Sequence, residues 1–170
     1  MVSKKPDSLK KGDWIVHTYY GIGQIKSVET KSIGDEKTKY FKVIARNSEF
    51  FVPVGQIDTD RVRPVASDYK LRKAKKILKE EPNLFPDDHN DRKKLLNETT
   101  SDSSMEVSAQ TIRDLRFRKK DHGLNDFETK ILHNVEKLFI REWSIIQDIS
   151  EEDALERFEK VMEEPEPIKK

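Results

Sequence analysis

The 170-residue chain has no cysteine, which excludes disulfides and thiolate metal sites and is typical of a protein in a reducing compartment. No apolar run approaches the roughly 20 residues that a membrane-spanning helix needs. The lysines within residues 1–11 are not followed by the apolar stretch of a secretory signal. Charged residues (38%) outnumber hydrophobic residues (34%). These features predict a cytoplasmic protein without a membrane partner.

Signatures of catalysis and of metal binding are also missing. The four histidines, at positions 17, 89, 122 and 133, are scattered and lack metal-ligand spacing. Glycine is scarce, and the GIG segment at residues 21–23 forms neither a Walker loop nor a dinucleotide fingerprint. We therefore expect a binding protein rather than an enzyme, with no metal, cofactor or small-molecule substrate.

The formal net charge is only +1, but the charges are unevenly distributed. Basic residues outnumber acidic ones up to about His122, and acidic residues dominate after it. This asymmetry is compatible with an anionic partner for the first part of the chain. It is equally compatible with a solvated surface that ends in an acidic tail.

Residues 12–65 have the composition and alternation of β-structure. Short strands are predicted over 13–18, 22–33, 38–45 and 49–54, and this close spacing favours antiparallel hairpins that close into a small barrel. Gly21 and Gly23 lie where a strand must bend or adopt a positive φ. Pro53 cannot donate a ladder hydrogen bond, so the strand EFFVPV (residues 49–54) is expected at an edge of the sheet.

The hydrophobic period changes to that of helices after Pro64. Helices are predicted over 67–81, 91–98, 105–121 and 127–147, with a last one from 151 onward. Asn125 and Glu128 have the spacing of a capping box. The predicted fold class is therefore α+β, with a small antiparallel β-barrel domain in residues 1–66 and an all-helical domain of four or five helices in residues 67–170.

Five segments of the chain stand out when they are taken together and in order. They are LKKGDWIVHTYYGIGQIKSVET (9–30), KYFKVI (39–44), FVPV (51–54), RVRPV (61–65) and IRDLRFRKKDHGLNDFETKIL (112–132). These segments, in this order, resemble the CarD/CdnL family of bacterial transcription regulators. The N-terminal domain of that family is shared with the RNA-polymerase-interacting domain of the transcription-repair coupling factor.

The resemblance implies a division of labour between the two domains. The N-terminal domain would be a Tudor-like or SH3-like barrel that binds the β subunit of RNA polymerase through an edge strand and side-chain contacts. The helical domain would contact promoter DNA at the upstream fork of the bubble, without base-specific readout, and stabilise the open complex. The protein would then be associated with the nucleoid and need no cofactor.

The resemblance places the polymerase-binding surface on Lys31 in the second strand and on Phe51 before the V-P pair, with Ile33 and Pro53 beside them. Some relatives have arginine at the Phe51 position, so a charged contact would become an apolar one here. Adjacent strand residues face opposite sides, so one of Phe50 and Phe51 must point inward. We expect Phe51 to point outward.

The resemblance places a DNA wedge on Phe85, where many relatives have tryptophan. Phenylalanine can still pack against an exposed base. The carboxylates of Asp87 and Asp88 would repel phosphates, and basic residues return only at Arg92 and Lys93. Trp143 is the alternative wedge, but it belongs to a continuous apolar helical stripe and is expected in the core.

The segment RDLRFRKK (residues 113–120) is the main basic candidate for DNA contact. Its basic members are Arg113, Arg116, Arg118, Lys119 and Lys120, and a helix would place Arg113, Arg116 and Lys120 on one face. Contacts from these side chains to phosphates would be sequence-independent and sensitive to salt. The alternative is a solvated face on which Arg113 or Arg118 pairs with helical acids. The lysines of residues 70–79 form a second positive surface, or simply the solvated side of a connecting helix.

A second class of function remains open. In it, the chain is a Tudor-like or SH3-like peptide-binding or scaffolding module without direct DNA contact. Four aromatic residues could then line a cage for a cationic ligand. They are Trp14, Tyr19, Tyr20 and Tyr40.

Overall fold

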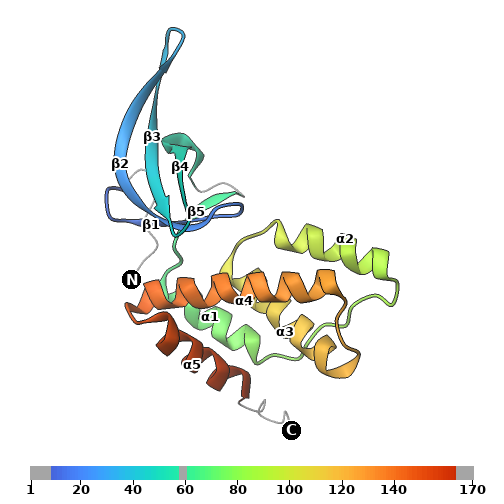
Figure 1. The fold of residues 1–170 in the computed structure, drawn as a ribbon. Coiled ribbons are helices and arrows are strands. Elements are labelled where there is room, and N and C mark those ends of the chain that lie inside the picture. The colour runs from blue at the N-terminus through green and yellow to red at the C-terminus, as the bar shows by residue number, and fades with distance from the viewer. Residues whose placement is uncertain (1–8, 58–60, 164–170) are drawn as a thin grey trace. The chain divides into compact units, whose positions relative to one another are not determined.

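The computed structural model describes residues 9–57 and 61–163. The chain divides into a β-unit that ends at Val65 and a helical unit that begins at Ala66 (Figure 1). Among the described residues, the β-unit contains five antiparallel strands and the helical unit contains five helices, which confirms the predicted α+β class. Within the described ranges, no helix combines the length and the apolar character needed to cross a membrane.

The five strands of the β-unit form one sheet. They are β1 (Trp14–His17), β2 (Gly21–Ile33), β3 (Glu36–Ala45), β4 (Ser48–Pro53) and β5 (Val62–Pro64), and a short 3-10 turn, η2 (Val54–Gln56), follows β4. Hydrogen bonds order them β4-β3-β2-β1-β5. This is an open sheet, and its edge strands β4 and β5 share no ladder among the described residues. The edge position predicted from Pro53 is confirmed, and β2 and β3 continue as a long hairpin beyond the other strands (Figure 1).

Strand register brings the alternating apolar residues of the β-unit onto one buried side. Val43 on β3 lies opposite both Ile25 on β2 and Phe50 on β4, and all three side chains are buried. Gly23 is required here because a Cβ atom at its position would lie 2.5 Å from the Val43 side chain. Gly21 has a φ of 81°, as expected for the turn into β2.

The described part of the helical unit consists of five helices. They are α1 (Asp68–Leu78), α2 (His89–Thr100), α3 (Met105–Asp121), α4 (Asp126–Gln147) and α5 (Glu151–Glu163). Ser67, Ser104 and Asn125 accept backbone hydrogen bonds at the starts of α1, α3 and α4. Glu128 completes the predicted capping box of α4.

Helix α2 is longer than predicted at both ends. Its N-cap is Asp88, whose side chain accepts hydrogen bonds from the backbone N–H groups of Asn90 and Asp91. At the other end the Thr99 and Thr100 hydroxyls donate to carbonyls one turn earlier and continue the helix into the polar segment. Side-chain hydrogen bonds to the local backbone explain both extensions.

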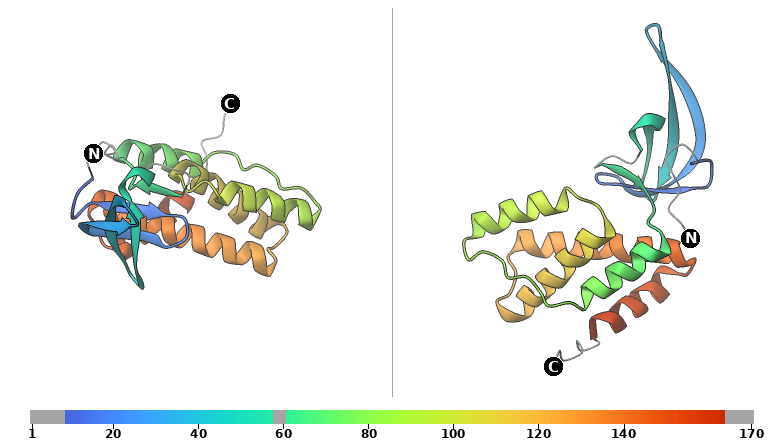
Figure 2. Two further views of the ribbon diagram at one scale, coloured as in Figure 1. Left: turned by 90° about the horizontal axis from the view of Figure 1, so that it is seen from above. Right: turned by 180° about the vertical axis from the view of Figure 1, so that it is seen from behind.

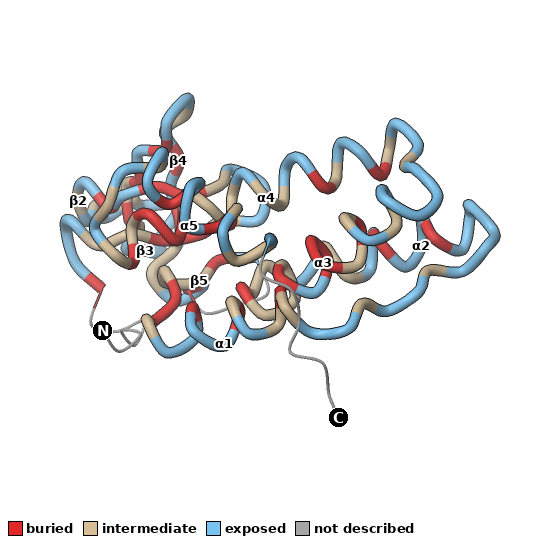
Figure 3. Tube along the Cα trace, turned by 90° about the horizontal axis from the view of Figure 1, so that it is seen from below, coloured by how far each residue is buried: buried red, intermediate tan, exposed pale blue. Residues whose placement is uncertain are grey.

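The core of the helical unit lies where α3 meets α1 and α4, and where α5 packs on α4 (Figure 2). Buried stretches recur along these helices between exposed ones (Figure 3). Trp143 is 1% exposed and meets the ring of Phe139 edge-on at 6.3 Å between centroids. Its predicted place in the core is confirmed, so Trp143 is not a surface wedge.

Candidate functional site

The outward side of β4 carries the first group of predicted site residues. Phe50 is buried, whereas Phe51 is 37% exposed, so the expected orientation of the two rings is confirmed. Phe51 lies opposite Lys42 on β3, and Pro53 lies opposite Tyr40. Because directly opposed residues share a side of the sheet, these four residues face outward together.

Lys31 joins this outward side from β2. Its Nζ lies 3.3 Å from the centroid of the Phe51 ring and 5.7 Å from that of Tyr40. This geometry is a cation–π contact, which holds the ammonium group over the ring while leaving its charge available to a partner. None of the ion pairs within the described ranges involves Lys31. The nearby Lys42, by contrast, pairs with Glu49 at 3.2 Å.

Ile33 lies two residues beyond Lys31 on β2 and is 70% exposed. Strand alternation puts it on the same side of the hairpin as Lys31. The structure therefore places the four predicted polymerase-contact residues on the outward side of β2 and β4, and it brings Lys31 and Phe51 into direct contact.

A hollow of about 500 Å³ lies beside β4. Its lining residues are His17, Thr18, Tyr19, Tyr20, Phe51, Val52, Pro53, Gln56, Arg61 and Val62. Tyr20 stacks on Phe50 with 4.5 Å between centroids, and Tyr19 meets Tyr20 edge-on. Trp14 and Tyr40 are not part of this lining, so the four aromatics proposed for a cage do not come together around it.

His17 fixes one wall of the hollow. Its Nδ1 accepts hydrogen bonds from the backbone N–H groups of Tyr19 and Tyr20, at 3.0 and 3.1 Å. Burial, and then the positive charge of Arg61, lower the pKa of His17, which favours the neutral ring. Sequence reasoning did not assign His17 or Arg61 to a site, because their proximity depends on β1 pairing with β5.

In the helical unit, Arg92 and Arg118 converge on one buried carboxylate. Glu128 is 1% exposed, and its oxygens lie 2.8 Å from Arg92 Nε and 3.4 Å from Arg118 Nε. Burial by itself raises the pKa of Glu128, but hydrogen bonds from Arg92, the Asn125 backbone and Arg118 outweigh burial and hold it below its usual value. These contacts tie α2, α3 and the start of α4 together.

Arg113 and Arg116 also hold acids of this chain. Arg113 is 7% exposed, and its Nε donates to Asp114 at 2.8 Å. Arg116 donates to Glu136 on α4 and to Glu159 on α5. Although burial lowers the pKa of Arg116, those two carboxylates raise it above its ordinary value, so the group is permanently charged. Arg113 and Arg116 were predicted to share one helix face with Lys120. In the structure the two arginines contact different carboxylates of this chain.

Residues 82–88, which we call the loop, belong to the segment between α1 and α2 and are held at one end by Asp114, the partner of Arg113, and at the other end by Arg92. The Asn83 N–H donates to the same Asp114 oxygen that Arg113 holds, at 2.9 Å. Arg92 Nη1 donates to the carbonyl oxygens of Pro86 and Asp87. An irregular segment held in this way keeps a defined conformation, because its polar backbone groups have fixed partners.

This tied loop presents two apolar side chains. Leu84 is 78% exposed, whereas the predicted wedge residue Phe85 is only of intermediate exposure. Asp88 is the N-cap of α2, and hydrogen bonds from the backbone N–H of Asp91, and then from that of Asn90, lower the pKa of its carboxylate. Sequence reasoning missed Leu84, because nothing in the local pattern distinguishes it from a residue packed under the loop.

The remaining predicted cations are exposed lysines. Lys93 lies on α2 with its Nζ 5.4 Å from the Phe127 ring, and Lys119 and Lys120 lie in the last turn of α3. Within the described ranges, none of these three lysines takes part in an ion pair. They are therefore available to an anionic ligand, whereas Arg92, Arg113, Arg116 and Arg118 already hold carboxylates.

The two units match the models of two protein-domain families, one after the other along the chain. Residues 9–66 match the CarD-like/TRCF RID domain, and residues 73–159 match the CarD C-terminal domain. The chain belongs to the CarD-like family of transcription factors. Its RID domain, a Tudor-like domain, implies interaction with RNA polymerase.

Individual relatives show the same division. The chain is 29% identical over 144 residues to YdeB of Bacillus subtilis (strain 168), a protein proposed to be a transcription factor, and this match covers 82% of the chain and 93% of YdeB. It is 36% identical over 75 residues to the transcription-repair-coupling factors of Staphylococcus haemolyticus (strain JCSC1435) and Staphylococcus aureus (strain USA300). Those matches cover 44% of the chain and 6% of each factor.

Proposed function

We propose that this protein regulates transcription initiation by binding the β subunit of RNA polymerase through its β-unit and promoter DNA through its helical unit. The DNA contact lies near the upstream fork of the bubble, and it stabilises the open complex without base-specific readout. The observation that carries the proposal is the contact of Lys31 on β2 with Phe51 on the outward side of the edge strand β4, within a domain that belongs to the RID family. The protein acts where RNA polymerase acts, on the nucleoid in the cytoplasm.

The polymerase-binding surface consists of the β4 edge and the side chains beside it. An edge strand offers unpaired backbone groups to which a strand of a partner can add. Phe51, Pro53 and Ile33 provide apolar contact on the outward side, and Lys31 provides a cation for an acidic side chain of the partner. Because the ring of Phe51 holds the Lys31 ammonium in place, less side-chain freedom is lost on binding.

A binding assay with an isolated fragment of the polymerase β subunit tests this surface. Lys31→Glu and Phe51→Ala are each expected to weaken binding at least tenfold. The matched control is Lys37→Glu, an exposed lysine of the same hairpin on the opposite side of the sheet. If both surface variants bind with wild-type affinity, the assignment of this surface to polymerase binding is wrong. If the wild type itself does not bind the fragment, the proposed polymerase function is wrong.

The DNA surface combines phosphate contacts with an apolar contact. Lys93, Lys119 and Lys120 contact phosphates, and their exposure and lack of ion pairs in the described structure support this role. The loop of residues 82–88 presents Phe85 and the more exposed Leu84 to an unstacked base at the fork. We assign a positioning role to Arg92 and Arg113, which tie that loop, and to Arg116 and Arg118, which tie the helices behind it.

Fork-DNA binding separates these contributions. Leu84→Ala and Phe85→Ala are expected to weaken binding to fork DNA and to leave binding to fully paired duplex unchanged. The control is Leu95→Ala, which truncates a leucine of α2 that is 40% exposed. If the loop variants and the control bind fork DNA equally well, the loop has no role in the contact.

The alternative of a peptide-binding module has weaker support. Tyr19 and Tyr20 do line the hollow beside β4, but Arg61 lines it as well. A positive charge at that place opposes a cationic ligand. Titration with methylated or basic peptides therefore serves as a negative control for the polymerase assay.

A further inference from the structure

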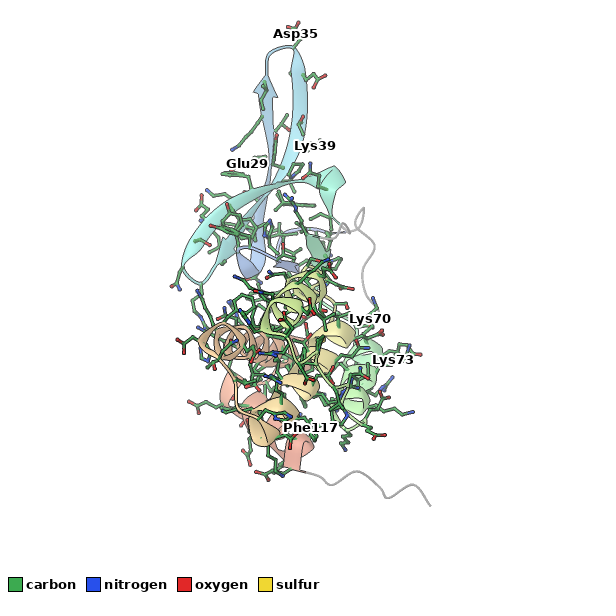
Figure 4. All side chains as sticks on the ribbon, turned by 90° about the vertical axis from the view of Figure 1, so that its right-hand side faces the viewer. Glu29, Asp35, Lys39, Lys70, Lys73 and Phe117 are labelled. Carbon is green, nitrogen blue, oxygen red and sulfur yellow. The ribbon has the colours of Figure 1, made fainter. Side chains whose placement is uncertain are left out.

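Helix α1 carries a concentration of positive charge outside the DNA surface proposed above. Residues 68–79 contain six lysine or arginine residues and one acid, Asp68. The exposed basic residues are Lys70, Arg72, Lys73 and Lys76. Figure 4 shows Lys70 and Lys73 on the outer side of the helix. We call these four residues the α1 basic row.

The charge of the α1 basic row is only partly neutralised. Arg72 lies 3.4 Å from Asp68, and Lys73 lies 3.9 Å from Glu106 on α3. Lys70 and Lys76 take part in no ion pair within the described ranges. Exposed pairs of this kind are weak and screened by salt. The row and its two acidic partners together keep a net charge of about +2 at neutral pH.

The placement of Lys70 is electrostatically unfavourable for the helix alone. It is the third residue of α1, in the first turn, and its backbone N–H donates to the Ser67 N-cap. The N-terminal end of a helix carries a partial positive charge, so cations there are disfavoured and anions are favoured. Lys70 is a cation at this unfavourable place, and no ion pair within the described residues compensates it. Its charge therefore indicates a function outside the helix.

The helix that carries the row is anchored by buried side chains. Leu71, Ala74 and Leu78 are buried and hold α1 in the helical unit. A rise of about 1.5 Å per residue puts Arg72 and Lys76 roughly 6 Å apart along the axis, on adjacent turns. Duplex DNA carries one negative charge per about 1.7 Å of its axis, so several cations of one helix can contact phosphates at the same time.

Other anionic partners fit this surface less well. A helix that lies on a membrane needs an exposed apolar face, but the apolar side of α1 is buried in the protein. Binding of single strands depends on several aromatic side chains that stack with successive bases. Among the described residues, the aromatic ring in contact with the row is that of Tyr69, which lies 5.3 Å from Lys73 Nζ.

We infer that the α1 basic row is a second DNA-binding surface, which contacts the phosphates of fully paired duplex DNA. This inference rests on the proposed DNA contact of the helical unit and adds a site on α1 that is distinct from Lys93, Lys119 and Lys120. The contact is independent of sequence and does not involve the loop of residues 82–88.

The test is the salt dependence of binding to a fully paired duplex, measured with the full chain. The row variant replaces Lys70, Arg72, Lys73 and Lys76 by glutamine, which has a similar helix propensity. The control variant makes the same charge change at four exposed lysines of the β-unit: Lys10, Lys26, Lys37 and Lys39. A third variant has arginine in place of the three lysines of the row and therefore keeps the charge.

Each phosphate contact contributes about 0.9 to the slope of log K against log salt, so the row variant is expected to lower the slope by roughly 2–4. Its duplex affinity at 0.1 M salt should fall at least tenfold, whereas the control and charge-conserving variants should stay within about twofold of the wild type. Circular dichroism confirms that each variant is folded, and binding to the polymerase β fragment should be unchanged.

Two results overturn the inference in distinguishable ways. If the row variant keeps the wild-type slope while Lys119→Gln with Lys120→Gln lowers it, the row does not contact DNA and the proposed function stands. If the wild type itself does not bind duplex or fork DNA, the proposed DNA function fails together with the inference.

Discussion

Replacing Glu128 by alanine should strongly destabilise the helical unit. Glu128 is 1% exposed and accepts hydrogen bonds from Arg92, Arg118 and the Asn125 backbone. The substitution removes both carboxylate oxygens and therefore all three hydrogen bonds at once. It also leaves Arg92, which is 8% exposed, without its carboxylate partner.

The expected magnitude follows from those contacts. Breaking a buried ion pair by removal of one partner costs about 3–5 kcal/mol, because the remaining charge is buried and uncompensated. Arg92 keeps its hydrogen bonds to the Pro86 and Asp87 carbonyls, which moderates this cost. Loss of the capping-box bond adds about 1 kcal/mol. We therefore expect the free energy of unfolding to fall by about 3–5 kcal/mol.

Urea unfolding followed by circular dichroism at 222 nm measures this loss. The matched control is Asp126→Ala, which removes an exposed acid from the same first turn of α4 and should cost less than about 1 kcal/mol. Equal losses in the two variants would refute the reasoning, because they would mean that Glu128 acts only on the helix dipole.

The charge of Glu128 makes the effect dependent on pH. Its pKa in the folded protein lies below the ordinary value of 4.5, so the folded state binds fewer protons than the unfolded chain. The stabilisation is therefore complete above about pH 5 and is lost as the pH falls below that range. The difference in the free energy of unfolding between the wild type and Glu128→Gln should therefore become smaller as the pH is lowered from 7 to 4.

Three further changes test other parts of the structure. Gly23→Ala should lower the free energy of unfolding by about 1–3 kcal/mol, because the new Cβ atom would lie 2.5 Å from a buried valine side chain. Gly55→Ala places its Cβ atom in open space and should leave the free energy of unfolding unchanged. Urea unfolding of the two variants measures both effects. Phe158→Ala should cost about 3–5 kcal/mol in the same assay because the ring is fully buried, and Leu155→Ala, at a residue that is 46% exposed, should cost far less. The lowered pKa of His17 means that the folded state prefers the neutral ring, so the stability advantage of the wild type over His17→Gln should shrink from pH 7.5 to 5.5. A constant difference over that range, measured through NMR signals of the β-unit during urea unfolding, would contradict the assigned protonation.

The strand and helix predictions succeeded where a local pattern carried the information. Strand alternation predicted that one of Phe50 and Phe51 points inward, the family resemblance selected Phe51 as the outward one, and Pro53 predicted an edge strand; the structure confirms all three. The spacing of Asn125 and Glu128 predicted a capping box, and the structure has one. These features depend on neighbours within a few residues, so the sequence contains the whole interaction.

The sequence did not show which basic residues form ion pairs with acids of this chain and which do not. A helical wheel places Arg113 and Arg116 on one face, but it does not show which acids lie across from them. Arg116 meets Glu159 on α5, and Arg92 meets Glu128 on α4. The same limit applies to Leu84, since its exposure depends on hydrogen bonds that tie the loop to distant helices.

By itself, the sequence determined the α+β class, the edge strand, the helix caps and the resemblance to the CarD/CdnL family. Only the tertiary structure decided that Lys31 rests on Phe51 and that four arginines hold internal carboxylates while neighbouring lysines stay exposed. The physical reason is one of range. Periodicity and capping arise from contacts within one or two turns of chain. The ion pairs of Arg92 with Glu128 and of Arg116 with Glu136 and Glu159 join residues 20 or more positions apart, whose meeting depends on how the helices pack.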